Sequence, residues 1–324
     1  FNMFLPSDHP DFPWIGMVFA PPIIGVWYWC TDQYIVQRVL SAKNVSEARK
    51  GTIFAGYLKL LPIFMFFIPG LIAYAMTKTG QLSYGSSDQV FPTLVRELLP
   101  SGIRGLVAGG LLAALMSSLS SVFNSCSTLF TMDIYKKLYP ETNEKKLVFV
   151  GRIATGIVVL SGILWIPFIK VVSGAGLYTY LQSVQAYIAP PIASVFLLGL
   201  FWSRINARGA LTALVGGFIA GMIRLGLEIK KSTLTVDGIW YQIADLNFLY
   251  FAIFSFLTCV VVLIAVSMLT PPPDLEKING LTYDTSKKNI AEADHPKSDK
   301  INSYIILAIL ALILIYFSPI GIGG

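Results

Sequence analysis

Hydrophobic residues gather into about eight long stretches along this sequence, separated by polar or charged connections. Each stretch has roughly 17–27 residues, near or above the length that a helix needs to cross the ~30 Å hydrocarbon core of a bilayer. Backbone polar groups in lipid must be satisfied within the segment, and the even alternation of a β-barrel strand is absent. The pattern therefore predicts an all-α, multi-pass membrane protein with helices near 14–40, 52–76, 105–131, 147–169, 177–202, 209–227, 248–269 and 304–320.

Two connections have a character of their own. Residues 78–104 contain the amphipathic piece FPTLVRELLP, which predicts a surface helix within a loop. Residues 271–302 begin with three prolines and continue charged and polar, as is typical of a flexible linker. Lys and Arg are concentrated in the first, third, fifth and seventh connections, so the positive-inside rule predicts that these are cytoplasmic and that residues 78–104 are extracellular.

Composition supports a membrane protein and argues against several other classes. Hydrophobic residues make up 55% of the chain and charged residues 13%, against about 25% charged in soluble domains. The net charge of +6 is spread over membrane-flanking loops, so nucleic acid is not expected as a partner. The three cysteines lie in apolar stretches at unrelated spacings, which indicates neither a disulfide framework nor a thiolate metal site. Both histidines lie in loops and no nucleophile–base pair is visible, so an enzyme is not expected.

The third stretch carries a stripe of small, oxygen-bearing side chains inside an otherwise apolar helix. At 3.6 residues per turn, one face collects Ala114, Ser117, Ser118, Ser121, Ser125 and Thr128. Oxygen atoms at membrane depth suit either a close-packed neighbouring helix or a hard cation, which prefers oxygen ligands. The residues alone leave both interpretations open.

Consecutive prolines occur at membrane depth in two stretches, at Pro21–Pro22 and Pro190–Pro191. Proline removes a backbone donor and frees a carbonyl, so each pair predicts either a simple kink or a discontinuous helix around a transport site. Asp32, further along the first stretch, is expected to cap local backbone or to pair with Arg38.

Other polar residues at depth are candidates for contact with a solute. Tyr28 lies near the middle of the first stretch, where an aromatic ring can stack on a sugar. Lys59 is a functional candidate as an ionisable residue in a span, although it can also snorkel to the cytoplasmic surface. Gln182 and Gln185 share a face, and their amides suit either sugar hydroxyls or a neighbouring helix.

Small residues four apart in the sixth stretch predict close helix packing without chemistry; they are Gly209, Ala213, Gly217 and Gly221.

Three blocks of the sequence resemble one family, the sodium:solute symporters, in its sodium–glucose cotransporter branch. They are YWCTDQYIVQRVLSAKN (28–44), LMSSLSSVFNSCSTLFTMDIY (115–135) and GLFWSRINARGALTALVGGFI (199–219), supported by GYLKL and LQS-x-x-x-Y-x-x-PP. The resemblance covers nearly all of residues 10–225. It implies a transporter fold of two inverted five-helix repeats, of which this chain would supply the second half.

The resemblance also implies a domain organisation. The second repeat would occupy residues 1–202, followed by two accessory helices in 203–270, a cytoplasmic linker in 271–302 and a final helix in 303–324. The first repeat would lie upstream and would be needed for function. We expect the chain to lie in the cell membrane, surrounded by lipid.

Site residues follow by resemblance from the matched positions. The sodium ligands would be the carbonyl of Ala114 and the hydroxyls of Ser117 and Ser118. Sugar contacts would be Lys59 and Gln182, with Tyr28 as the intracellular gate that stacks on the sugar and Trp29 beside it. Ser121 joins the sugar contacts because of its place on the stripe.

The implied function is symport of a monosaccharide, such as glucose or galactose, driven by sodium as the coupling ion. Gly25 departs from the family, which has a polar sugar contact three positions before the gate tyrosine. The substrate could therefore be myo-inositol, another polyol, an amino acid or a carboxylate, and a sodium- or sugar-responsive sensor or channel stays open. The core helices contain no mid-span arginine to pair with a carboxylate, which favours a neutral polyhydroxylated solute.

Overall fold

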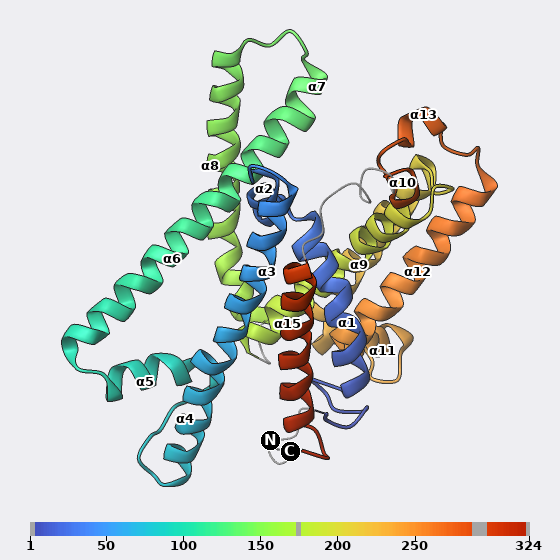
Figure 1. Cartoon of the computed structure of the whole chain (residues 1–324). Helices are drawn as coiled ribbons and strands as arrows, with labels where there is room; N and C mark the ends of the chain where they lie inside the picture. The colour runs from blue at the N-terminus through green and yellow to red at the C-terminus, as the bar shows by residue number, and fades with distance from the viewer. Residues whose placement is uncertain (1–3, 173–175, 287–296, 322–324) are drawn as a thin grey trace. The chain divides into compact units, whose positions relative to one another are not determined.

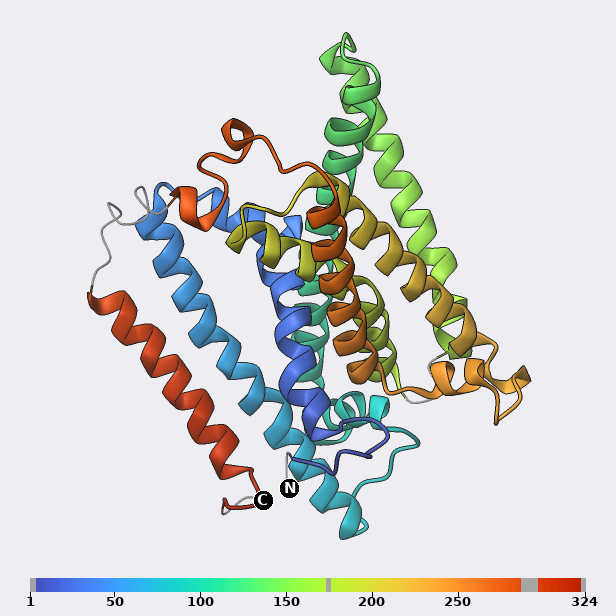
Figure 2. The ribbon, with the colours of Figure 1, turned by 90° about the vertical axis from the view of Figure 1, so that its right-hand side faces the viewer.

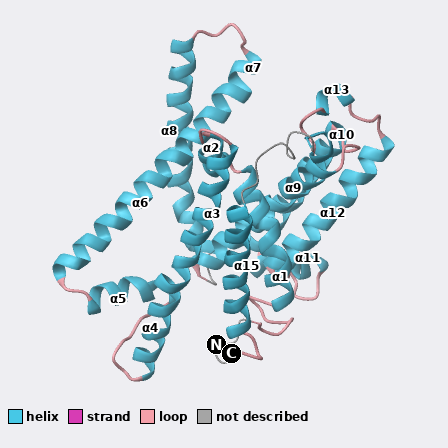
Figure 3. Ribbon diagram, viewed as in Figure 1, coloured by secondary structure: helices cyan, strands magenta, loops and turns pink. Residues whose placement is uncertain are grey.

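The computed structural model describes residues 4–172, 176–286 and 297–321. Apart from one isolated bridge between Leu5 and Pro13, the regular structure of these residues is helical, and Figure 3 draws no strand in them. Eight helices of the described chain are long and apolar enough to cross a membrane: Trp14–Thr31, Val45–Lys78, Ser101–Leu138, Glu144–Pro167, Leu177–Phe201, Ala207–Ile229, Phe248–Leu269 and Lys297–Tyr316. The predicted all-α, multi-pass architecture is confirmed.

Several of these spans change helix type along their length. In chain order the elements are α1 (Trp14–Val26), η1 (Trp27–Thr31), α2 (Gln33–Leu40), α3 (Val45–Pro62), η2 (Ile63–Phe67), α4 (Ile68–Lys78), η3 (Ser87–Gln89), α5 (Val90–Leu98), α6 (Ser101–Thr128), η4 (Leu129–Tyr135), α7 (Lys136–Leu138), α8 (Glu144–Val172), α9 (Leu177–Phe201), α10 (Ala207–Ile229), η5 (Lys231–Thr233), α11 (Ile239–Asp245), α12 (Phe248–Leu269), α13 (Leu275–Ile278) and α15 (Lys297–Tyr316). The segments η1, η2 and η4 are π-helical, a form that is often found at functional sites.

The chain divides into two compact units. The first contains residues Phe1–Tyr57 and Tyr178–Gly324, and the second contains Leu58–Leu177. Helix α3 passes from the first unit into the second after Tyr57.

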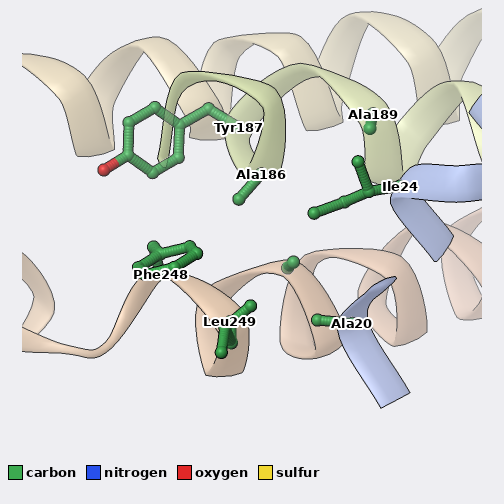
Figure 4. Packing of buried hydrophobic residues seen from close by; sticks show 8 residues of the cluster. Ala20, Ile24, Ala186, Tyr187, Ala189, Phe248 and Leu249 are labelled. Carbon is green, nitrogen blue, oxygen red and sulfur yellow. The ribbon is translucent and has the colours of Figure 1, made fainter. Parts of the chain in front are cut away.

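The first unit is built on a core that three helices share. Helices α1, α9 and α12 contribute the buried cluster Ala20, Ile24, Ala186, Tyr187, Ala189, Phe248, Leu249 and Ala252. Figure 4 shows these side chains gathered between the three helices. Four of these eight residues are alanines, which let the helix backbones approach closely, and close approach is what drives helix association in lipid.

Helix α10 packs against its neighbours along the predicted stripe of small residues. Gly209, Ala213, Gly217 and Gly221 are all buried. A Cβ atom on Gly217 would lie 2.7 Å from Cys259 Sγ of α12 and 2.8 Å from Pro191 Cβ of α9. Figures 1 and 2 show α10 and α12 running side by side. The interpretation of this stripe as packing is confirmed.

Polar residues at both ends of α10 donate hydrogen bonds to backbone carbonyls of other segments of the same chain. At the N-terminus, the Asn206 side chain accepts from Gly209 N at 2.9 Å and donates to Pro271 O at 2.8 Å. Near the C-terminus, the buried Arg224 donates to Ala244 O at 2.6 Å and to Leu246 O at 2.7 Å. Both ends of α10 are thereby fixed to the segments that flank α12.

In the second unit, α6 packs against α8 near Gly151. The hydroxyl of Ser127 donates to Gly151 O at 2.8 Å, and a Cβ on Gly151 would lie 3.1 Å from that hydroxyl. Helix α5 coincides with the amphipathic piece predicted as a surface helix, and its Leu94 joins a small cluster with Ala73 and Leu82. That prediction is confirmed.

Two boundaries differ from the sequence prediction. The first stretch does not continue as one helix to residue 40, because Asp32 adopts extended backbone and its carboxylate accepts from Tyr34 N at 3.0 Å, capping α2. The expectation that Asp32 caps local backbone is thus confirmed. Helix α15 begins at Lys297, inside the segment predicted as linker, and the short helix α13 lies there too. Residues 287–296 of that linker lie outside the described residues.

Candidate functional site

The oxygen-rich face of α6 is the first part of the candidate site. Helix α6 is unbroken from Ser101 to Thr128, so Ala114, Ser117, Ser118 and Ser121 lie on one face as the spacing predicts. Ala114, Ser117 and Ser118 are exposed, and Ser121 is half-buried with its hydroxyl donating to Ser117 O at 3.0 Å. This face presents side-chain and backbone oxygens that suit a hard cation.

Further along the same stripe, the serines turn inward. Ser125 is 4% exposed and its hydroxyl donates to Ser121 O at 2.9 Å, which is consistent with a packing role. Thr128 is exposed, whereas the contact with α8 uses Ser127 and the buried Thr131. The seam between the helices is therefore displaced from the predicted stripe, because α8 packs on the face that carries Ser127.

The aromatic block forms the second part of the site, in the π-helical segment η1. Trp27 packs against the three-helix core, while Trp29 is 45% exposed. The Tyr28 ring stands between them, with centroids 6.2 Å from Trp27 and 5.1 Å from Trp29, perpendicular to the latter. The helix ends directly after this block, and the hydroxyl of Thr31 donates to Trp27 O at 2.6 Å. Tyr28 thus lies at a helix break, between one indole packed on the core and one that is partly exposed.

The first helix breaks at Asp32 and not at its prolines. Helix α1 runs through Pro21 and Pro22, and α9 runs through Pro190 and Pro191. In α9 the pair is fully buried and packs against Gly217 of α10. The carbonyl that Pro191 leaves without an intrahelical donor, Tyr187 O, lies 2.5 Å from where Gly221 would carry a Cβ. The second proline pair therefore serves packing.

Gln182 lies one turn after the start of α9, half-buried, with its amide donating to the Tyr178 hydroxyl at 3.4 Å. Gln185 is half-buried on the same helix. Lys59 lies in α3 with an exposed side chain, just inside the second unit. Lys59 and the oxygen face of α6 thus belong to the second unit, and Tyr28, Trp29 and Gln182 belong to the first.

A buried polar network in the first unit was not singled out by the sequence. The Tyr187 hydroxyl donates to the Glu228 carboxylate, and the Arg224 guanidinium lies 5.8 Å from the ring centroids of both Tyr187 and Phe251. The signal in the sequence that could have revealed this network is Arg224, an ionisable residue inside an apolar stretch. The network joins α9, which carries Gln182, to α10 and α12.

The eight candidate spans of the described residues define a helical, multi-pass membrane protein. A sequence model of the sodium:solute symporter family matches residues 1–217. This chain belongs to that family, as the resemblance of its sequence blocks implied.

Named relatives cover nearly the whole chain. It is 39% identical over 310 residues to the sodium/myo-inositol cotransporter 2 of Mus musculus, covering 91% of this chain and 46% of the relative. It is 38% identical to the sodium/glucose cotransporter 4 of Danio rerio, covering 91% and 48%. It is 41% identical over 288 residues to the sodium/glucose cotransporter 1 of Ovis aries, covering 84% and 43%. The chain thus spans about half the length of the curated relatives that it matches.

Proposed function

We propose that this chain is part of a secondary active transporter in which sodium entry drives the uptake of a small polyhydroxylated solute. The solute is a monosaccharide such as glucose or galactose, or a polyol such as myo-inositol. Membership of the symporter family supports this, as do relatives that are named as cotransporters of both kinds. In this proposal residues 1–202 form the second inverted repeat, and the first repeat completes the transport site.

The observation that carries the proposal is the exposed oxygen face of α6. The carbonyl of Ala114 and the hydroxyls of Ser117 and Ser118 lie within one helical turn and are not covered by packing. In an unbroken helix the Ala114 carbonyl accepts one backbone hydrogen bond and keeps its second lone pair for a cation. Hard cations prefer such oxygen ligands, so these residues suit sodium, with the remaining ligands supplied by the first repeat.

Solute contacts are assigned to residues that combine an apolar surface with hydrogen-bonding groups. Tyr28 stacks on the sugar and closes the intracellular exit, with Trp29 beside it. The Gln182 amide and the Lys59 ammonium bind hydroxyl groups, and Ser121 contributes from the position one turn beyond the sodium face. The change from η1 to extended backbone at Asp32 supports a movable role for Tyr28, because the regular helix is interrupted directly after the aromatic block.

Coupling follows from the position of the sodium ligands. Sodium shifts the conformational equilibrium only to the extent that it binds one state more tightly than the other. If sodium bridges α6 and a helix of the first repeat, it binds the outward-open state more tightly than the other states. In that state the sugar site is assembled. Loss of sodium to the cytoplasm then releases this connection, and Tyr28 yields to let the solute leave.

In this proposal, Gly25 is the residue that determines whether the transporter prefers a sugar or a polyol. A Cβ at position 25 would meet only Trp29 Cδ1, at 4.0 Å, so the space beside the aromatic block is open. A solute with an additional hydroxyl group, or a water molecule, can occupy the volume that a polar side chain fills in family members. The altered position also keeps the alternatives open: another neutral solute, an amino acid, a carboxylate, or a sensor that no longer transports.

The test is uptake into vesicles that contain the protein together with its first repeat. We expect radiolabelled glucose or myo-inositol to accumulate only under an inward sodium gradient, with sodium-dependent current. Competition between the two solutes identifies the preferred substrate. Solute-evoked current without accumulation would indicate a channel or sensor, and accumulation without a sodium gradient would contradict the proposal.

A further inference from the structure

Helices α10 and α12 enclose an apolar groove on the first unit, and none of the residues assigned to sodium or solute lines it. Its volume is about 320 Å³, within the range of small-molecule sites in proteins. One wall is formed by small residues of α10 and the other by aromatic and branched residues of α12, including Thr212, Gly216, Ala220, Phe254, Thr258 and Val262.

The groove exists because α10 carries a second face of small residues. Gly217 and Gly221 are buried against α12 and α9, but a Cβ on Gly216 would meet nothing within 4 Å. Thr212, Gly216 and Ala220 are exposed. The wall on α10 is therefore recessed by the lack of side-chain bulk, while Phe254 of α12 projects beside it, 58% exposed.

One end of the groove is positively charged. Arg208 precedes Thr212 by one turn on the same face, and the Thr212 hydroxyl donates to its carbonyl at 2.8 Å. The Arg208 side chain is exposed, and among the described residues its guanidinium has no hydrogen-bond or ion-pair partner. Arg204 lies at the same end and donates to Thr270 O at 3.0 Å. Arg208 thus supplies an exposed guanidinium one turn before the first lining residue of the groove on α10, whereas the guanidinium of Arg204 is bound to backbone carbonyls.

The dimensions match one leaflet of a bilayer. From Arg208 to Ala220 the helix rises by about 18 Å, at 1.5 Å per residue. Half of the ~30 Å hydrocarbon core is about 15 Å, so a chain that fills the groove places its polar end at Arg208. A transmembrane helix would cross both leaflets and would therefore extend well beyond this groove.

We propose that this groove binds one anionic phospholipid, with an acyl chain between α10 and α12 and its phosphate on Arg208. The groove supplies apolar contact, and the guanidinium supplies charge complementarity that a zwitterionic lipid matches less well. By the orientation predicted from the loop charges this is the cytoplasmic leaflet, where anionic lipids are concentrated. The site does not depend on the identity of the transported solute.

The experiment uses the purified protein in nanodiscs of phosphatidylcholine mixed with phosphatidylserine, followed by native mass spectrometry of the lipids that stay bound. We expect retention of phosphatidylserine over phosphatidylcholine by about fivefold, equivalent to roughly 1 kcal/mol for one arginine at an anionic surface. Arg208→Gln should remove this preference, and Gly216→Phe, which fills the groove, should remove the bound lipid itself.

Matched controls separate the site from general effects. Lys230→Gln removes a charge at the other end of α10, and Ile219→Phe adds bulk on an exposed position of the same helix that does not line the groove. Both should retain the lipid, and all variants should unfold at the wild-type temperature. Equal retention of the two lipids by the wild type, or unchanged retention in Gly216→Phe, overturns the proposal. A second protein chain that Gly216→Phe displaces would show that a helix covers the groove instead.

Discussion

At the scale of single residues, serines of one helix have different roles that depend on their neighbours. Ser117 and Ser118 are exposed on the oxygen face of α6, whereas Ser125 is buried and Ser127 bonds to Gly151 of α8. The spacing of residues defines which side chains share a face, but it does not say which face a neighbouring helix covers. Substitutions in the two groups should therefore have different effects.

Ser118→Ala should raise the sodium concentration for half-maximal uptake by about tenfold or more, since a hydrogen-bond-like contact to a charged group contributes about 1.5–3 kcal/mol. The measurement is the sodium dependence of uptake at saturating solute. Ser161→Ala on α8 is the control, because that hydroxyl is exposed and donates to Ile157 O of its own helix. An unchanged sodium dependence in Ser118→Ala would remove this residue from the sodium site.

Gln182→Ala should weaken the apparent affinity for solute by about tenfold while the sodium dependence stays as in the wild type, because one amide–hydroxyl contact is lost in a desolvated site. The two dependences are measured separately in the same vesicles. Tyr178→Phe is informative as a comparison, since it removes the partner of the amide without removing the amide. Parallel loss of sodium and solute affinity would point to a folding defect.

At the scale of helices, glycine and proline determine the packing of the first unit. Proline pairs were candidates for breaks, yet α1 and α9 continue through them, and Pro191 packs against Gly217. The helix break occurs at Asp32, where the carboxylate caps the next helix. Pro191 removes a backbone donor from α9 and frees the Tyr187 carbonyl. Gly221 allows α10 to lie directly against that carbonyl, so the helix tolerates the proline.

Gly217→Ala should destabilise the protein by about 1–3 kcal/mol, because the new methyl group would overlap Cys259 and Pro191. Thermal unfolding in detergent measures the loss. Gly226→Ala on the same helix has open space around the new Cβ and should unfold at or above the wild-type temperature. If both variants behave alike, close approach at Gly217 is not what holds α10 in place.

At the scale of the whole molecule, the proposed transport would be limited by the energy that sodium supplies. A tenfold sodium gradient is equivalent to about 1.4 kcal/mol, and a potential of about 100 mV adds roughly 2.3 kcal/mol per charge. For a neutral solute that moves with one sodium ion, the sum sets a ceiling on accumulation of a few hundredfold.

We therefore expect the steady-state ratio of solute across vesicles to stay below roughly a few hundredfold under these conditions. The ratio should fall by about tenfold when the sodium gradient is removed and the potential is kept. A labelled, non-metabolised sugar measured at several imposed potentials tests this. A ratio that exceeds the ceiling would require a second sodium ion per solute.

The sequence by itself determined the helical class, the number and approximate ends of the spans, the surface helix α5, the stripe of α10 and the family. These features depend on local properties: the length of an apolar segment, the 3.6-residue period and the spacing of small residues. Only the tertiary structure showed that the first helix breaks at Asp32, that Pro190 and Pro191 are packed, that Ser127 and not Thr128 contacts α8, and that Arg224 is buried. The last three depend on which residues distant in sequence lie against the helix, because burial and hydrogen-bond partners are set by the neighbour and not by the segment. The break at Asp32 rests on a local bond from Tyr34 N, which the sequence offered only as one of two roles for this carboxylate.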